Sequence, residues 1–251
     1  MPLIRHFFIR IMVTVDIFIP CFIDQIYPQT GFNMIKILEK YDIDVYYNEE
    51  QTCCGQISFN SGFWDDAKAI GEKFILEFNH NRPVVVPSAS CAGFVRNYYE
   101  QLFLNTGLHL EFRQLQKNIV EFTDYLVNTL KVSDLGAVFE HKVTYHDSCA
   151  ALREYKLGNE PRTLLSHVRG MELVEMKDTD VCCGFGGTFS VKNEPISTAM
   201  AQQKVQNALD TGAEYIVSTD ASCLIHLDGY IRKHNIPLKT IHIIDVLASG
   251  W

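Results

Sequence analysis

The tripeptide Cys-Cys-Gly occurs twice in this chain, at residues 53–55 and again at residues 182–184. A single cysteine precedes each copy, by 32 residues in the first case and by 33 in the second, and another follows it. The eight cysteines therefore form two sets of four. The first cysteine set is Cys21, Cys53, Cys54 and Cys91, and the second cysteine set is Cys149, Cys182, Cys183 and Cys223. Because a disulfide between adjacent cysteines is strained, each pair is expected to present two separate thiols.

The duplication extends to the segments around the cysteines. A short apolar run precedes the first cysteine of each set, Val13–Ile19 in one half and Lys142–His146 in the other. Residues 84–90 and 215–222 likewise precede the last cysteines, and amphipathic helical patterns lie between such runs. Strand–helix–strand alternation predicts right-handed parallel βαβ units. We therefore expect an α/β fold of two pseudo-symmetric βαβ halves with parallel sheets and with cysteines at the carboxyl ends of strands.

The same repeat predicts how the chain is divided. No low-complexity segment or long flexible linker separates the two copies, so the halves are expected to pack tightly. We predict a first half at residues 12–135 and a second half at 136–251. A natural strand opens near Met12, so residues 1–11 are interpreted as an N-terminal extension.

The chemistry of the cysteines favours metal sites. Ligands of open parallel sheets bind at the carboxyl ends of the strands, where six separate loops would bring four thiols per half. The long gaps differ from the compact Cys-x-x-Cys pairs of zinc ribbons, and four thiolates are the usual ligands of an iron–sulfur cluster. Adjacent thiolates also reach two metal atoms of a cluster more easily than two corners of one ion. We predict one iron–sulfur cluster per half, with all eight cysteines as ligands. A zinc-stabilised scaffold and a metal-free thiol–disulfide oxidoreductase stay open as alternatives.

Two histidines lie close to these cysteines in the sequence. His226 follows Cys223 by three residues and is a candidate additional metal ligand, whereas His146, three residues before Cys149, is expected as a hydrogen-bonding neighbour. Glycines such as Gly184 follow the Cys-Cys pairs and would remove side-chain bulk where the backbone passes a cluster.

Charge and hydropathy exclude several classes of function. The net charge is −8 and no Lys/Arg cluster is present, which argues against nucleic-acid binding. The apolar N-terminal stretch is interrupted by Arg10 and Asp16, so no membrane span is expected. No targeting segment is evident, and we expect a cytoplasmic protein, where thiols stay reduced.

The duplicated pattern resembles a known family. It is carried by Thr52-Cys53-Cys54-Gly55-Gln56, Pro87-Ser88-Ala89-Ser90-Cys91 and the run from Cys182 to Lys192. These segments are similar to the cysteine-rich CCG-domain iron–sulfur oxidoreductases, which include the cysteine-rich component of heterodisulfide reductases and the lactate-utilisation protein A family. The resemblance extends from about Val13 to the C-terminus.

The resemblance implies a function. It points to an iron–sulfur redox subunit of a complex that oxidises L-lactate to pyruvate, with two companion subunits and a small hydroxy acid as substrate. In heterodisulfide reductases a fifth cysteine completes each motif, but Phe94 and His226 stand at those positions here. A four-thiolate cluster in each half fits this ligand count.

Overall fold

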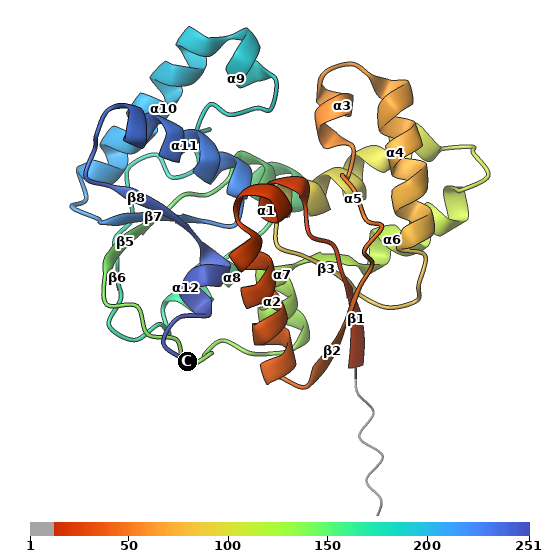
Figure 1. Cartoon of the computed structure of the whole chain (residues 1–251), viewed down its shortest axis with the longest axis horizontal. Helices are drawn as coiled ribbons and strands as arrows, with labels where there is room; N and C mark the ends of the chain where they lie inside the picture. The colour runs from red at the N-terminus through yellow and green to blue at the C-terminus, as the bar shows by residue number, and fades with distance from the viewer. Residues whose placement is uncertain (1–12) are drawn as a thin grey trace, which may run out of the picture.

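A computed structural model describes residues 13–251 and contains two four-stranded sheets, one in each half of the chain (Figure 1). The strand orders are β2-β1-β3-β4 and β6-β5-β7-β8, and every pairing is parallel. The strands of the first sheet are β1 (Val13–Ile17), β2 (Ile43–Tyr47), β3 (Val84–Val86) and β4 (Ile119–Glu121), and those of the second are β5 (Lys142–Tyr145), β6 (Glu172–Leu173), β7 (Tyr215–Ser218) and β8 (Lys239–His242). The predicted α/β fold with two pseudo-symmetric parallel halves is confirmed.

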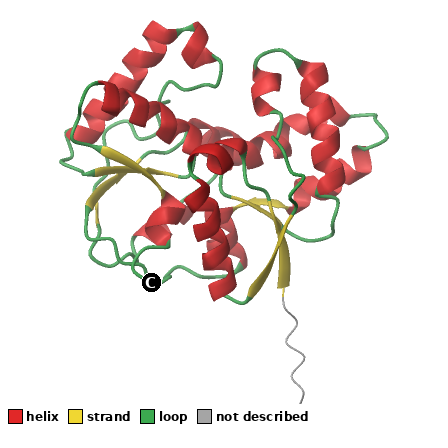
Figure 2. Ribbon diagram, viewed as in Figure 1, coloured by secondary structure: helices red, strands yellow, loops and turns green. Residues whose placement is uncertain are grey.

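Helices connect the strands and surround both sheets (Figure 2). Those of the first half are α1 (Cys21–Ile26), α2 (Pro28–Lys40), α3 (Gln56–Asn60), α4 (Trp64–Glu77), α5 (Ala89–Phe103), α6 (His109–Asn118), α7 (Phe122–Asp124) and the π-helical turn η1 (Tyr125–Thr129). Those of the second half are the π-helical turn η2 (Ala151–Tyr155), α8 (Glu160–Leu165), α9 (Phe189–Lys192), α10 (Glu194–Leu209), α11 (Ala221–Lys233) and α12 (Ile243–Leu247). In Figure 1 the pairs α3–α4 and α9–α10 project on the same side of the molecule, at the upper right and upper left.

One hydrophobic core extends across both halves. Buried side chains of the first half, such as Val15 and Ile37, belong to the same cluster as Val143 and Ile244 of the second half. Figure 1 shows α2 and α12 between the two sheets, and these helices are in contact. Burial of apolar surface between the halves therefore contributes to the stability of both.

Polar contacts reinforce the packing of α2 against α12. The Asp245 carboxylate accepts hydrogen bonds from Thr30 Oγ1 at 2.7 Å and from Asn33 Nδ2 at 2.8 Å. The ring of Trp251, the last residue, lies under the ammonium group of Lys40, 3.7 Å from Nζ to the ring centroid. The C-terminus of the second half is thus fixed on the first half.

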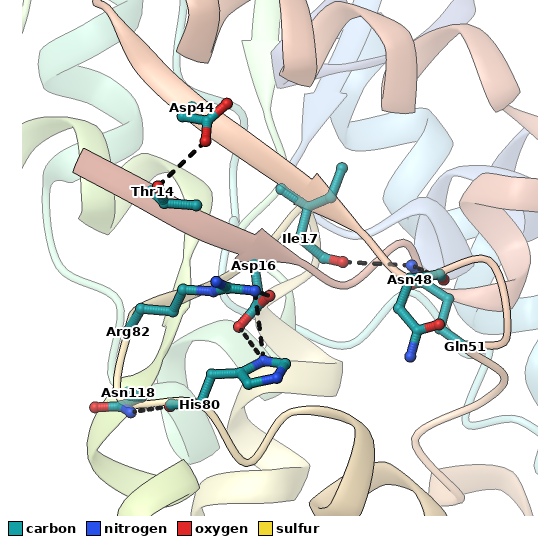
Figure 3. Close-up of polar contacts among 9 residues, drawn as sticks. All are labelled: Thr14, Asp16, Ile17, Asp44, Asn48, Gln51, His80, Arg82 and Asn118. Carbon is teal, nitrogen blue, oxygen red and sulfur yellow. Dashed lines mark hydrogen bonds and ion pairs between the residues drawn. The ribbon is translucent and has the colours of Figure 1, made fainter. Parts of the chain in front are cut away.

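The acidic residue that interrupts the apolar start of the chain is part of the fold. Asp16 is buried in β1, where its carboxylate accepts from Arg82 at 2.5 Å and lies 3.1 Å from His80 Nδ1 (Figure 3). Arg82 and His80 precede β3, at the end of that strand opposite to the cysteine loop. A buried carboxylate needs such partners, so this cluster is interpreted as structural.

Two sequence predictions concern the limits of the chain and its halves. Residues 1–11, interpreted as an extension, lie outside the described residues. The boundaries 12–135 and 136–251 stay a prediction. Among residues 13–251, no helix combines the length and apolarity that crossing a membrane requires.

Candidate metal centre

The cysteines follow the carboxyl ends of the parallel strands in both halves. Cys21 begins α1 after β1, and Cys149 lies between β5 and η2. Cys91 and Cys223 lie in the first turns of α5 and α11, and the Cys-Cys pairs occupy the loops after β2 and β6.

All eight thiols line a single cavity of about 190 Å³. The structure thus brings together every cysteine predicted from the sequence as a ligand. Each set occupies the carboxyl edge of its own sheet, and the two edges face one another across the cavity.

In the first cysteine set the thiols form a chain of contacts. Cys21 contacts Cys53, Cys53 contacts Cys54, and Cys54 contacts Cys91. Hydrogen bonds from the thiols of Cys21 and Cys54 lower the pKa of Cys53. The Gly55 N–H also donates to Cys53 Sγ at 3.3 Å. Cys53 therefore ionises more readily than Cys21 and Cys54, whose pKa values are raised by the same contacts and by burial.

The second cysteine set repeats this arrangement. Cys149 Sγ lies 3.9 Å from Cys182 Sγ, and the contacts continue from Cys182 to Cys183 and from Cys183 to Cys223. Hydrogen bonds from Cys149 and Cys183 lower the pKa of Cys182, and the Gly184 N–H donates to its Sγ at 3.4 Å. In this set the pKa of Cys223 is lowered as well, to about 6, by hydrogen bonds from Cys183 and His146. Four converging soft donors in each set fit a metal or an iron–sulfur cluster.

Gly184 shapes the loop that presents the second Cys-Cys pair. Its φ of +97° is left-handed, and a Cβ at this position would lie 2.6 Å from the carbonyl oxygen of Ser197. The Ser197 hydroxyl donates to the Gly184 carbonyl at 2.8 Å, and His226 Nε2 lies 3.1 Å from the same hydroxyl. The structure thus places His226 against Ser197, where it supports the glycine loop. Its role as a metal ligand stays a prediction.

His146 lies closer to the thiols than its place in the sequence indicated. The side chain is fully buried, and the polar group that it contacts is the Cys223 thiol, in line with the expected role of a hydrogen-bonding neighbour. One ring nitrogen, Cys183 Sγ and Cys223 Sγ all lie within 4.8 Å of one another. The signal in the sequence was its position as the first residue after the strand that leads to Cys149, which directs it to the carboxyl edge of the sheet.

A buried carboxylate connects the two halves beside the cavity. Asp220, the residue before α11, accepts from Ser88 Oγ at 2.9 Å and from the Ser90 N–H at 3.0 Å. Ser88 is the N-cap of α5, the helix that carries Cys91. The second half therefore helps to position a thiol of the first.

The rest of the cavity wall offers little charge. Among the described residues that line it there is no lysine, arginine or histidine, and Glu154 is the only carboxylate. Burial raises the pKa of Glu154. Such a wall suits thiolate-bound metal better than it suits a small free carboxylate, which normally needs a cationic partner.

Comparison with known proteins agrees with this geometry. The family model of the cysteine-rich domain CCG matches residues 15–96 and 143–228, one copy in each half. The fold and the site thus define a protein with a duplicated cysteine-rich CCG domain.

Similar proteins show which family of CCG-domain proteins this chain belongs to. Lactate utilization protein A 2 of Bacillus cereus is 36% identical over 237 residues, which cover 94% of this chain and 98% of the relative. Lactate utilization protein A of Halalkalibacterium halodurans is 37% identical over 233 residues, covering 93% and 96%. The chain belongs to the lactate utilization protein A family.

A solved structure shares the fold at low sequence identity. A hypothetical protein from Helicobacter pylori matches with a TM-score of 0.65 and 10% identity, over 95% of this chain and 49% of that chain. At this identity the likeness concerns the fold alone.

Proposed function

We propose that this protein is the iron–sulfur redox subunit of a complex that oxidises L-lactate to pyruvate, and that it relays electrons through a cluster in each half. The observation that carries the proposal is that both four-thiol sets line one cavity. The names of the relatives support lactate as the substrate of the system. We further propose two companion subunits as partners.

The residues that would hold the clusters are the first and the second cysteine sets. A bound iron–sulfur cluster supplies one-electron transfer at a potential that hydrogen bonds and burial adjust. The N–H groups of Gly55 and Gly184, which already donate to thiols, would provide such hydrogen bonds.

The stoichiometry of the reaction fits two adjacent carriers. Conversion of L-lactate to pyruvate releases two electrons and two protons. A chain with two one-electron sites can accept both electrons in turn. The proposal therefore assigns to this subunit the storage and transfer of electrons.

The wall of the cavity supports a division of labour between subunits. A lactate carboxylate would meet no basic side chain among the described lining residues. We therefore propose that the hydroxy acid binds on a companion subunit and that its electrons reach this chain from there.

Metal analysis of protein purified without oxygen tests the proposal. We expect a brown protein with several iron and acid-labile sulfide atoms per chain and with electron paramagnetic resonance signals from two clusters. A colourless protein with stoichiometric zinc would instead support a scaffold. A colourless, metal-free protein with reactive thiols would support a thiol–disulfide oxidoreductase.

A single cysteine substitution tests whether each half holds its own cluster. Cys54→Ser should lose about half of the iron, because the second cysteine set is complete without Cys54. The matched variant Cys183→Ser should lose the other half. Loss of all iron in either variant would show that the halves share one cluster.

A further inference from the structure

The two halves differ at one position beside their cysteine sets. His146 immediately follows β5 and Phe18 immediately follows β1, so both lie three residues before the first cysteine of their set. Phe18 is fully buried and packs edge-on against Phe74 and Phe78, with ring centroids 4.7 and 5.8 Å away. The first half thus has an inert aromatic ring where the second half has an imidazole.

The imidazole has no nitrogen or oxygen partner that explains its burial. Buried polar groups are normally satisfied, and the polar group that the His146 side chain contacts is the Cys223 thiol. It is also the only histidine found to share a potential metal-binding group with cysteines within residues 13–251. A buried imidazole that is directed at thiols, and not at oxygen or nitrogen partners, is expected of a metal ligand before its metal is bound.

The three donors lie close enough to belong to one metal centre. Donor atoms bound tetrahedrally to one metal at about 2.0–2.3 Å lie about 3.3–3.8 Å apart. One nitrogen of His146 and the sulfurs of Cys183 and Cys223 all lie within 4.8 Å of one another. Shifts of up to about 1 Å would bring the three donors within bonding reach of a metal centre between them.

The position of His146 is fixed by the backbone and by its neighbour. The backbone N–H of His146 donates to the Val217 carbonyl at 2.8 Å, and the backbone carbonyl of His146 accepts from Ser218 Oγ at 3.0 Å. The next residue, Asp147, forms a two-pronged ion pair with Arg162, at 2.8 and 2.6 Å. The imidazole is therefore held toward the thiols before metal binding, as a preorganised ligand would be.

We propose that His146 is a nitrogen ligand, beside Cys183 and Cys223, of the cluster that the second cysteine set would hold (the second centre), so that this centre is mixed imidazole–thiolate while the cluster of the first cysteine set (the first centre) is all-thiolate. This inference rests on the proposed iron–sulfur function. Histidine ligation of iron in a cluster is chemically established and changes its potential. The two centres would therefore be unequal in spectrum and potential despite their common fold.

Pulsed electron paramagnetic resonance of full-length protein labelled with ¹⁵N-histidine tests the assignment. In the paramagnetic oxidation state, we expect the strong coupling of a directly bound histidine nitrogen in the wild type. It should persist in Cys54→Ser, which keeps the second centre, and vanish in Cys183→Ser, which keeps the first. In His146→Phe, which copies Phe18, the coupling should be lost while iron stays in the first centre. His226→Gln should retain the coupling.

The outcomes separate this inference from the proposed function. Iron-loaded wild-type protein without histidine coupling, or with only the weak coupling of a hydrogen-bonded nitrogen, overturns the ligand assignment and leaves the iron–sulfur function standing. Coupling that survives in His146→Phe, or disappears in His226→Gln, also overturns it. Protein without iron overturns both. The wild-type measurement decides even if His146→Phe fails to fold.

Discussion

Individual glycines beside the thiols are required by backbone geometry, and Gly184 is the strictest case. Its left-handed φ disfavours any side chain, and a Cβ would also collide with the Ser197 carbonyl. Gly187 shares a left-handed φ of +63° but faces open space. The two positions therefore separate backbone strain from steric collision.

Alanine substitution at these two glycines should have unequal effects. Gly184→Ala is expected to lower the free energy of unfolding by roughly 1–3 kcal/mol, because the loop must move away from Ser197. Under the proposed function it should also reduce the iron bound by the second cysteine set. Gly187→Ala should cost only about 1–2 kcal/mol and keep its iron. Chemical denaturation and iron analysis provide the comparison. Equal iron loss in both variants would contradict the steric explanation.

A buried carboxyl group makes stability depend on pH. Glu121 caps α7, where its Oε2 accepts from the N–H groups of Thr123 and Asp124 at 2.7 and 3.1 Å. Burial outweighs these donors and raises the pKa of Glu121 from 4.5 to about 8. The folded state therefore keeps this proton at pH values where the unfolded chain has released it.

The sign of the effect follows from proton binding. Between about pH 5 and pH 8 the folded state binds more protons at Glu121, so its contribution to the free energy of unfolding decreases as pH rises. Denaturation at pH 6 and pH 9 should show a loss of up to a few kcal/mol in the wild type and a smaller loss in Glu121→Gln. Equal losses would mean that Glu121 is already ionised in the folded protein.

In both halves a helical lysine donates hydrogen bonds to the loop that precedes the Cys-Cys pair. Lys204 of α10 is buried and donates through Nζ to the carbonyls of Asp178 and Thr179, in the loop before the second pair. Lys73 of α4 donates to the carbonyl of Glu50, before the first pair, but is partly exposed. This equivalence extends the pseudo-symmetry from the sheets to the supports of the thiols.

Substitution of these two lysines tests whether their hydrogen bonds stabilise the loops before the Cys-Cys pairs. Lys204→Met should lower the free energy of unfolding by about 1–3 kcal/mol, since the loop loses charge-assisted hydrogen bonds. Under the proposed function it should also reduce the iron bound by the second cysteine set. Lys73→Met should have a smaller effect on the first centre because water can replace its exposed ammonium. Similar iron contents in Lys204→Met and the wild type would show that the loop is held by other contacts.

The molecule as a whole is held together by contacts between the halves. The shared core, the bonds of Asp245 to α2 and the contact of Asp220 with the N-terminus of α5 all connect residues far apart in sequence. The cavity depends on these contacts, because its two cysteine sets face each other only when the halves are docked.

Docking of the halves should make unfolding cooperative. We expect one transition, monitored alike by circular dichroism and tryptophan fluorescence. Asp245→Ala should lower its midpoint and cost about 1–3 kcal/mol, because Thr30 and Asn33 lose their acceptor. The surface variant Asp210→Ala should stay within about 0.5 kcal/mol of the wild type. Two separate transitions would show that the halves unfold independently.

The sequence alone determined the duplicated α/β fold and the eight thiols at the carboxyl ends of strands. Both follow from local patterns: strand-forming runs, helical periodicity and the fixed place of each cysteine directly after a strand or its loop. That order along the chain is preserved in any correctly formed parallel sheet, so it can be deduced without coordinates.

Only the tertiary structure decided how the two cysteine sets lie relative to each other and which histidine lies beside the thiols. The single cavity depends on packing between halves, which no local pattern records. His226 and His146 both lie three residues from a cysteine, yet α11 directs the former to Ser197 and β5 directs the latter to the thiols. Side-chain direction is set by the backbone of each element, and the distance that matters for a ligand is measured through space.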